Sequence, residues 1–377
     1  MNKQLVVFSN GDAWDARTWS NVPYMFLNAF KRQFPDIPIV TFDMSSVDNR
    51  GLLWLVRGTW NVLATPMVGK LFTFDRTKFR HYLLNKKIRR FTKNVAGGEG
   101  VFLSFDFSNP APKTPGYKVC LLCDWTIEYE ISEHQHREPT DAERRLIERQ
   151  REVISGADLV TALFPYSAKL ISETCAGSKV TCYGLPSNAL CDVRPVLLRS
   201  SNRLLFIGNS KYAESLAVVV EGLENFNLSN PGHEYVLDVI GMEHGPGEWG
   251  GYVVYHGYLR KDVEEEKALY YTLLTSCRAL INVSDRWVGA SSIVEALSLG
   301  TPVVVTPNAE LEELLGEPEF GLWCGYTAED VERCLAELSE STELQLESMS
   351  RNAVARVSRF TWDNLVFQWA KDVGFID

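Results

Sequence analysis

Short runs of β-forming residues alternate with helical stretches along the whole chain of 377 residues. This alternation is typical of parallel sheets covered by helices, because each parallel strand needs a long crossover before the next one. We predict strands at 4–9, 39–42, 101–105, 118–122, 159–162, 180–183, 203–207, 236–240, 252–255, 279–283 and 303–306. The sequence therefore predicts an α/β protein built on parallel sheets.

A break in this pattern divides the chain into two similar halves. Gly184, Pro186 and Pro195 interrupt any periodic run of apolar residues there. We predict a Rossmann-like domain at 1–185, a linker at 186–202, a second Rossmann-like domain at 203–358 and a C-terminal segment at 359–377. Ligands of such sheets bind beyond the carboxyl ends of the strands, so we expect the site in the cleft between the halves.

Charge and the length of apolar runs exclude several classes of function. The 38 basic and 48 acidic residues give a net charge of −10, which opposes nucleic-acid binding. The apolar run at 5–8 is too short for a signal sequence, and no stretch approaches the ~20 apolar residues of a membrane-spanning helix. Eight scattered cysteines favour a reducing compartment. We therefore expect a cytoplasmic protein with no nucleic-acid partner.

Cys120 and Cys123 form a lone CxxC inside a strand-like run. No second CxxC and no suitably spaced histidine pair completes a zinc-binding set. Buried core thiols are the favoured interpretation, and a redox or metal-binding pair is the alternative.

Several common motifs are absent or incomplete. Residues 245–250 match the GxGxxG pattern, but Pro246 lies within the match and a strand follows where the motif requires a helix. The sequence contains no Walker motif, GxSxG elbow or HExxH motif. It also has no Asp-x-Asp pair to hold a divalent metal against a nucleotide diphosphate. The sequence therefore predicts no metal site and no bound cofactor.

The segment 281–305 carries the strongest functional signal, since it reads as strand, small-residue loop, helix and strand. Gly289 permits a close backbone approach. A helix that begins near Ser291 or Ser292 would present unpaired N–H groups to a diphosphate without a metal. Glu295, one turn further on, fits two roles equally well: it could accept hydrogen bonds from ribose hydroxyls, or complete a capping box that begins at Ser292.

The same segment resembles the nucleotide-sugar motif of the GT-B glycosyltransferases, in particular the large retaining family 4. Residues 295–304 follow the family's Glu-Ala and Gly-Thr-Pro-Val-Val pattern. The resemblance implies two Rossmann-like domains with parallel sheets facing across a cleft, a nucleotide diphosphate sugar as donor, retention of configuration, and ribose binding by Glu295. Trp287 replaces the first acidic residue of the family's pair, and Asp285 is a nearby acid. The segment 359–377 resembles the helical tail that crosses back to the first domain in this fold.

The loop after the predicted strand at 203–207 extends the resemblance to the donor. Asn209 and Glu214 occupy the positions where the family has an arginine and a lysine, so Lys211 is the nearest cation. A positive charge there would stabilise the departing diphosphate. Lys211 and Glu295 are therefore predicted catalytic residues. The predicted donor contacts in this half are Gly208, Asn209, Tyr258, Arg286, Gly289, Ser291 and Ser292.

Three segments of the first half also resemble the family. Gly11 lies in a loop similar to the one that approaches donor and acceptor, and is a predicted donor contact. Residues 19–24 are similar to a Trp-Ser-Gly-Thr-Pro-Tyr sequence of some members, with Asn21 in place of glycine. Asp124 ends a strand where other members carry a His or Asp near the reacting carbon. It is a predicted catalytic residue, and capping of the following turn is the equal alternative.

The segment 78–93 carries seven basic side chains interleaved with apolar ones. A basic amphipathic helix could hold the protein to anionic lipid at the inner face of a membrane, which would suit a lipid-linked acceptor. A solvated helix packed on the first domain is the favoured alternative.

These features together predict a glycosyltransferase that moves a sugar from a nucleotide diphosphate sugar to an acceptor hydroxyl in glycan, polysaccharide or glycolipid biosynthesis. The predicted partners are the nucleotide sugar and a glycan or lipid-linked acceptor. One alternative is a nucleotide-sugar 2-epimerase of the same shape, which would release a new sugar from the donor alone. The other is a non-catalytic protein that binds sugar nucleotides without turnover.

Overall fold

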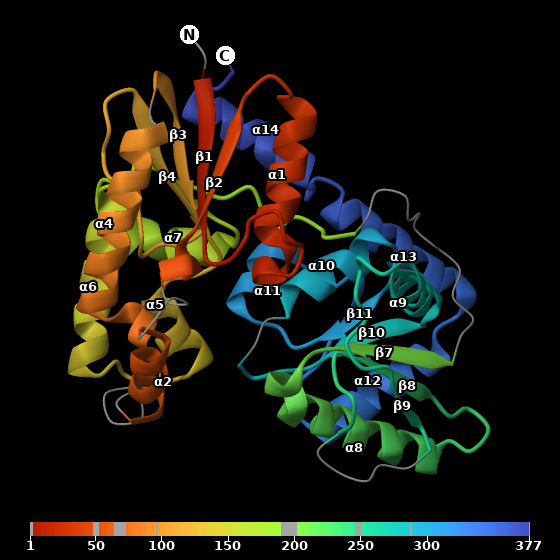
Figure 1. Ribbon diagram of the computed structural model, residues 1–377. Coiled ribbons are helices and arrows are strands. Elements are labelled where there is room, and N and C mark those ends of the chain that lie inside the picture. The colour runs from red at the N-terminus through yellow and green to blue at the C-terminus, as the bar shows by residue number, and fades with distance from the viewer. Residues whose placement is uncertain are drawn as a thin grey trace. The chain divides into compact units, whose positions relative to one another are not determined.

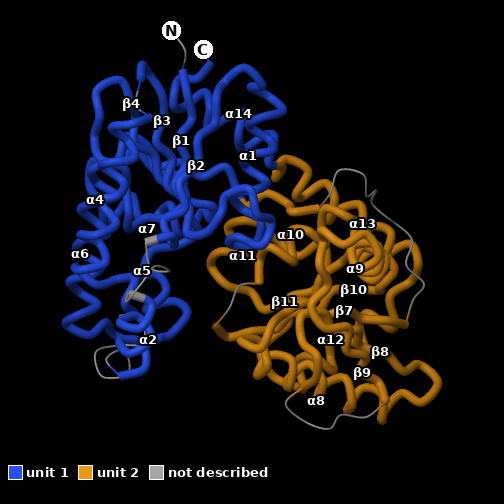
Figure 2. The backbone as a smooth tube through the Cα atoms, viewed as in Figure 1, with its two compact units in different colours: residues 1–184, 362–377 blue, residues 185–361 orange. Residues whose placement is uncertain are grey.

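The computed structural model describes residues 3–47, 53–63, 73–95, 97–189, 202–245, 251–286 and 289–376 (Figure 1). The chain divides into two compact units (Figure 2). Unit 1 comprises residues 1–184 and 362–377, and unit 2 comprises residues 185–361. Most of the segment that we predicted as a linker, residues 190–201, lies outside the described residues.

Unit 1 is built on a sheet of six parallel strands in the order β2-β1-β3-β4-β5-β6. The strands are β1 (Lys3–Ser9), β2 (Ile39–Asp43), β3 (Glu99–Ser104), β4 (Tyr117–Cys123), β5 (Leu159–Ala162) and β6 (Val180–Thr181). The helices are α1 (Val22–Gln33), α2 (Leu53–Leu63), α4 (Lys78–Val95), α5 (Ile127–Tyr129), α6 (Asp141–Ser155), α7 (Pro165–Thr174) and α14 (Trp362–Val373). All six strands predicted for this half are present, with shifts of up to two residues at their ends.

The centre of this sheet is apolar on both faces. In β1, the run from Leu5 to Phe8 is fully buried, as expected for a parallel strand covered by helices on each side. In α4, Leu84 and Ile88 pack into the core beside Phe8. The apolar face of α4 is therefore used inside unit 1, which agrees with the favoured interpretation of the segment 78–93. Its charged residues point outward, apart from the buried Arg80.

Helix α14 belongs to unit 1 although it is the last helix of the chain. Trp369 is fully buried, and its ring centroid lies 5.1 Å from that of Phe26 and 6.3 Å from that of Phe30, both on α1. The hydroxyl of Tyr183 donates to Asp372 Oδ2 at 2.6 Å. The tail thus completes the core of the first unit.

Three consecutive residues after β1 adopt left-handed backbone conformations. Trp19, Ser20 and Asn21, in the short helix η1 (Thr18–Asn21), have φ angles of 41°, 53° and 71°. Asparagine tolerates this region better than most L residues, which explains how Asn21 stands where the similar sequences have glycine.

Unit 2 is built on a second sheet of six parallel strands, in the order β12-β11-β10-β7-β8-β9. The strands are β7 (Arg203–Ile207), β8 (Val236–Ile240), β9 (Val253–Tyr255), β10 (Ala279–Asn282), β11 (Val303–Val305) and β12 (Gly321–Trp323). The helices are α8 (Ala213–Ser229), α9 (Glu264–Ser276), α10 (Ala290–Ser298), α11 (Ala309–Leu315), α12 (Ala328–Glu340) and α13 (Glu343–Val357).

Five of these strands match the prediction, and the edge strand β12 was missed. Its sequence Gly-Leu-Trp begins with glycine and has no β-branched residue, unlike the equally short Val-Val-Val of β11. Gly321 is required there because a Cβ would lie only 2.0 Å from the carbonyl oxygen of Val303 on β11.

The described cysteines are free thiols. Cys120 is fully buried, and burial raises the pKa of Cys120 and Cys123 above the ordinary thiol value. Redox-active and metal-binding cysteines need a lowered thiol pKa, so the raised pKa at both positions favours buried core thiols. Within the described part of the chain, no helix combines the length and apolarity needed to cross a bilayer.

The contact between α8 and α12 gives a test of the packing in unit 2. A Cβ at Gly222 of α8 would lie 2.6 Å from both the carbonyl oxygen of Ala328 and Val331 Cβ. We expect Gly222→Ala to lower the free energy of unfolding by about 1–3 kcal/mol, measured by urea denaturation. Gly58→Ala is the matched control, because Gly58 lies in α2 with no atom within 4 Å of the place that an alanine methyl would take. That change should raise stability by about 0.5–1 kcal/mol. Equal effects would contradict the close helix packing.

Candidate functional site

A small cavity of about 220 Å³ lies at the carboxyl ends of the strands in unit 2. Its lining comes from the loops after β7, β10 and β12 and from the start of α8. The residues are Ser210, Lys211, Ala213, Glu214, Ser215, Ser284, Asp285, Arg286 and Tyr326. The volume is below the ~300 Å³ of a typical small-molecule site, so it fits a group such as a diphosphate rather than a whole nucleotide sugar.

The loop after β7 is fixed by tight backbone contacts. A Cβ at Gly208 would lie 2.9 Å from the ring of Phe206, and the Gly208 N–H donates to the Ile240 carbonyl at 3.0 Å. The Asn209 side chain accepts a hydrogen bond from the backbone N–H of Lys211 at 3.1 Å, and so caps the short helix η5 (Ser210–Tyr212). Asn209 therefore has a structural role that brings Lys211 to the cavity.

The cavity holds two cations and two carboxylates. Arg286 lies 3.7 Å from Glu214 and 3.8 Å from Asp285, and its side chain is half exposed. The Lys211 ammonium lies 5.1 Å from the centre of the Tyr212 ring. The structure therefore brings the two predicted cations, Lys211 and Arg286, to one cavity. Trp287, which replaces the family's first acidic residue, lies outside the described residues.

Helix α10 starts beside this cavity. Its N-cap residue Gly289 has a left-handed φ of 58°, and the Gly289 backbone hydrogen-bonds to the buried Tyr212 hydroxyl, next to Lys211. Ser291 Oγ accepts a hydrogen bond from Asn188 at 3.1 Å, while Ser292 Oγ donates to the Gly289 carbonyl at 2.9 Å. The serine side chains are engaged within the chain, and the Ser292 N–H donates to the Gly289 carbonyl at 3.2 Å. The backbone N–H groups of Ala290 and Ser291 are therefore the first-turn donors available to an anion.

Asn282, which the sequence analysis did not single out, lies directly beneath this helix start. It is 4% exposed at the end of β10, and neither amide atom has a hydrogen-bond partner among the described residues. A Cβ at Gly289 would lie 2.7 Å from Asn282 Nδ2, so only glycine fits above it. A polar side chain at the end of the apolar run Ala-Leu-Ile-Asn was the signal available in the sequence.

Glu295 is buried in a cluster of donors. Its Oε1 accepts from the Lys261 ammonium at 2.5 Å and from the Tyr271 hydroxyl at 3.1 Å, and its Oε2 accepts from the Tyr270 hydroxyl at 3.0 Å. The carboxylate does not turn back to Ser292, so the capping-box alternative is wrong. The geometry leaves an acceptor position on Oε2, since each carboxylate oxygen can accept two hydrogen bonds.

Tyr258 does not line the cavity. It follows β9 with 70% of its surface exposed, in the loop that also carries Lys261. Tyr258 acts electrostatically on Tyr270, so it belongs to the surroundings of the Glu295 cluster.

The two predicted residues of unit 1 lie in loops after β1 and β4. Gly11 has a φ of 117°, and its N–H donates to Asp43 Oδ1 at 3.0 Å. Asp124 Oδ1 accepts from the Trp125 N–H at 2.9 Å and from the Cys123 thiol at 3.2 Å. Burial raises the pKa of the Asp124 carboxyl above its usual range. A raised carboxyl pKa suits a group that exchanges a proton, so its predicted role remains open to test.

Among the described residues, no group of three or more His, Cys, Asp or Glu side chains is arranged to hold a metal ion.

Two Rossmann-like units of six parallel strands each define the class of this protein: the chain has the GT-B fold of glycosyltransferases. No family model and no curated protein matches the sequence. Solved structures do match. Sucrose-phosphate synthase from Thermosynechococcus elongatus is 13% identical, with a TM-score of 0.64 over 98% of each chain. An α,α-trehalose-phosphate synthase (UDP-forming) from Burkholderia xenovorans is 11% identical, with a TM-score of 0.64 over 98% of this chain and 100% of that one.

TarM, known from S. aureus, is a third similar structure, with 10% identity and a TM-score of 0.57 over 78% of this chain. The chain spans only 58% of the length of TarM. At these identities the likeness establishes the fold. The predicted resemblance to GT-B enzymes is thus confirmed for the fold, and membership of family 4 stays a prediction.

The Glu295 cluster gives a second prediction. Glu295→Ala would leave the Lys261 ammonium and two tyrosine hydroxyls without their acceptor. We expect a loss of about 3–5 kcal/mol in the free energy of unfolding, measured by urea denaturation. As a control, Glu264→Ala removes a carboxylate that is 80% exposed and paired with Lys267, and should change stability by less than about 1 kcal/mol. A Glu295→Ala variant as stable as the wild type would contradict the buried network.

The raised pKa of Asp124 gives a third prediction. Burial favours the neutral Asp124 carboxyl in the folded protein. Its contribution to the free energy of unfolding is therefore fully present below the unfolded pKa of about 3.9. This contribution is lost as the pH rises through the folded-state pKa. Asp124→Asn keeps a side-chain oxygen that can accept from the Trp125 N–H, and it removes the loss of stability caused by ionisation of the carboxyl. We expect a higher Tm than wild type at neutral pH, with the gain disappearing as the pH falls to about 3.9.

Asp141→Asn is the matched control for this comparison. Arg144 lowers the pKa of the exposed Asp141 carboxyl, so that change should bring no gain in Tm at neutral pH. A pH-independent difference between Asp124→Asn and wild type would contradict the raised pKa.

Proposed function

We propose that this chain is a glycosyltransferase that moves a sugar from a nucleotide diphosphate sugar to an acceptor hydroxyl. The carrying observation is the start of α10 in a unit of the GT-B fold, where the backbone of its N-cap residue Gly289 hydrogen-bonds to Tyr212, the neighbour of Lys211 in the chain. Structural neighbours support this choice of substrate class. One is described as a UDP-forming trehalose-phosphate synthase, and another as an O-GlcNAc transferase in complex with UDP and GlcNAc.

The proposed chemistry is stabilisation of the departing diphosphate. The α10 N–H groups and the Lys211 ammonium supply positive potential where negative charge develops as the sugar leaves. In this proposal no divalent metal takes part, because the sequence has no Asp-x-Asp pair and the cations stand in its place. Glu295 accepts a ribose hydroxyl at the remaining position on Oε2, while Lys261 and the tyrosines hold the carboxylate still.

The proposed acceptor side lies in unit 1, with Asp124 and Gly11 as contacts to the acceptor or the donor sugar. We propose retention of the anomeric configuration, and one solved neighbour, a trehalose-6-phosphate synthase, is described in terms of transfer with retention. The outward charges of α4, within the segment 78–93, support a peripheral contact with anionic lipid and hence a lipid-linked or other glycan acceptor.

A ligand screen followed by a transfer assay tests this proposal. The full chain is first heated with UDP-, GDP-, ADP-, TDP- and CMP-sugars, and the true donor class should raise Tm selectively. With that donor and an acceptor panel, product formation should persist in EDTA, and NMR of the product should show the donor's anomeric configuration. Lys211→Met should lower kcat about 100-fold or more, as the loss of a group that stabilises a transition-state charge does.

Arg351→Gln is the control, since Arg351 is an exposed residue of α13 paired with Glu347. A new sugar released from the donor alone would identify a 2-epimerase instead. Saturable binding without turnover across all donors and acceptors would identify a binding protein. Activity that is lost in EDTA and restored by magnesium would refute the metal-free chemistry.

A further inference from the structure

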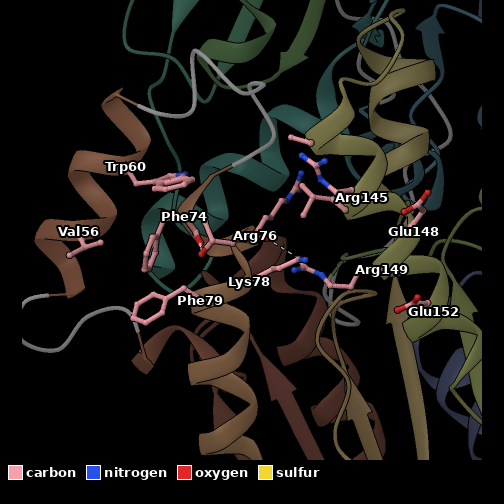
Figure 3. A pocket seen from close by; sticks show the side chains of 13 residues that line it. Val56, Trp60, Phe74, Arg76, Lys78, Phe79, Arg145, Glu148, Arg149 and Glu152 are labelled. Carbon is pink, nitrogen blue, oxygen red and sulfur yellow. Dashed lines mark hydrogen bonds between the residues drawn. The ribbon is translucent and has the colours of Figure 1, made fainter.

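Unit 1 contains a cavity of about 760 Å³ that the proposed donor site does not use. It lies among α2, η3 (Phe74–Arg76), the first turn of α4 and one face of α6 (Figure 3). The volume falls in the range of about 300–1,000 Å³ typical of ligand sites. Because α4 leads into β3 and α6 leads into β5, both helices begin at the edge where the strands end, which is the ligand-binding edge of such sheets.

One wall of this cavity is apolar. Trp60 of α2, Phe74 of η3 and Phe79 of α4 gather on one side, with Val56 next to them (Figure 3). The wall is held in place because the Phe74 N–H donates to Asn61 Oδ1 at 2.8 Å and Arg57 pairs with Asp75 at 3.3 Å.

The other wall is charged, with more cations than carboxylates. Arg76, Arg145 and Arg149 lie across from the aromatic side chains (Figure 3). The lining also includes Lys78, Glu148 and Glu152. Among the described residues, neither Arg145 nor Arg149 has a carboxylate within 4 Å, whereas Arg76 has Glu130 at 3.5 Å. The Arg149 guanidinium donates to the Arg76 carbonyl at 2.9 Å, and burial lowers its pKa, with Asp106 offsetting only part of the effect. A half-buried guanidinium without an ion-paired carboxylate can bind an anion, and guanidinium geometry suits phosphate.

The apolar wall continues onto the surface. Trp54, Leu55, Val62 and Leu63 of α2 are 47–70% exposed, and the helix carries no acidic residue. A monomeric protein rarely exposes such a cluster without a partner, and the cations beside it attract anionic lipid. The ligand that matches both walls and this surface is an anion with a long hydrocarbon chain.

We infer that this cavity binds a lipid phosphate from a bilayer. The phosphate group lies against Arg145 and Arg149. The first carbons of the lipid's hydrocarbon chain lie against Trp60, Phe74 and Phe79. The inference rests on unit 1 alone. Where the proposed transferase function holds, it also names the class of acceptor or anchoring lipid.

Vesicle co-sedimentation of the full chain tests the inference. Phosphatidylcholine vesicles that contain phosphatidic acid, a phosphate monoester, are compared with vesicles that contain phosphatidylglycerol and are matched for surface charge. We expect tighter binding to phosphatidic acid. Arg145→Gln should weaken that binding about tenfold, as the loss of a charged hydrogen bond does, and should leave phosphatidylglycerol binding almost unchanged. Arg145 is exposed, so the variant should fold normally.

Lys86→Gln removes the same charge from the outer face of α4, away from the cavity, and should affect both vesicle types equally. Phe79→Ser, in the apolar wall, should weaken phosphatidic acid binding more than Tyr82→Ser on the same helix. Equal affinity for the two vesicle types, or equal losses in Arg145→Gln and Lys86→Gln, would show surface attraction only and overturn the inference. Inorganic phosphate that competes as well as the lipid would overturn the role of the hydrocarbon chain.

The same variants separate this inference from the proposed function. Arg145→Gln should keep the Tm increase caused by the donor nucleotide, because the donor site lies in unit 2. Lipid binding with no nucleotide response would refute the transferase proposal and leave the lipid site standing.

Discussion

The buried Glu295 carboxylate is the interaction on which the candidate donor site depends. It ties α10 to α9 through two tyrosine hydroxyls and to the loop after β9 through the Lys261 ammonium. A charge this deeply buried persists only when donors surround it, so the four groups form or fail as a set. Their common result is a fixed position for α10, and with it the direction in which the first-turn N–H groups point.

The start of α10 is defined just as closely from the other side. Gly289 must be glycine, both for its positive φ and because Asn282 fills the space where a side chain would lie. The hydroxyl of Tyr212, which lies in the loop after β7, hydrogen-bonds to the Gly289 backbone. Packing within unit 2 therefore holds the start of α10 against Tyr212, next to the loop residue Lys211.

The fold was largely predictable from the sequence, because apolar strands between helical stretches leave a strong periodic signal. The failures have physical causes. β12 begins with glycine and has no β-branched residue, so its sequence gives a weak strand signal, and Gly321 permits a close backbone approach to β11. Lys261 and Tyr271 reach Glu295 from 34 and 24 residues away, and no local spacing records such a contact. The capping box at Ser292 failed because α10 begins at Ala290 with Gly289 as its N-cap, which places Ser292 inside the first turn. Asn282, which has no hydrogen-bond partner among the described residues, was by contrast visible as a polar residue in an apolar strand.

The return of α14 to unit 1 sets the order in which the protein matures during synthesis. The space beside Phe26 and Phe30 that Trp369 fills belongs to segments translated early, whereas Trp369 is translated only after all of unit 2. Unit 2 is continuous in sequence and can fold before α14 is translated, whereas part of the unit 1 interior stays open until α14 has been translated. A ribosome that stops before residue 362 would thus release a protein whose second half is complete and whose first half is prone to aggregation and degradation.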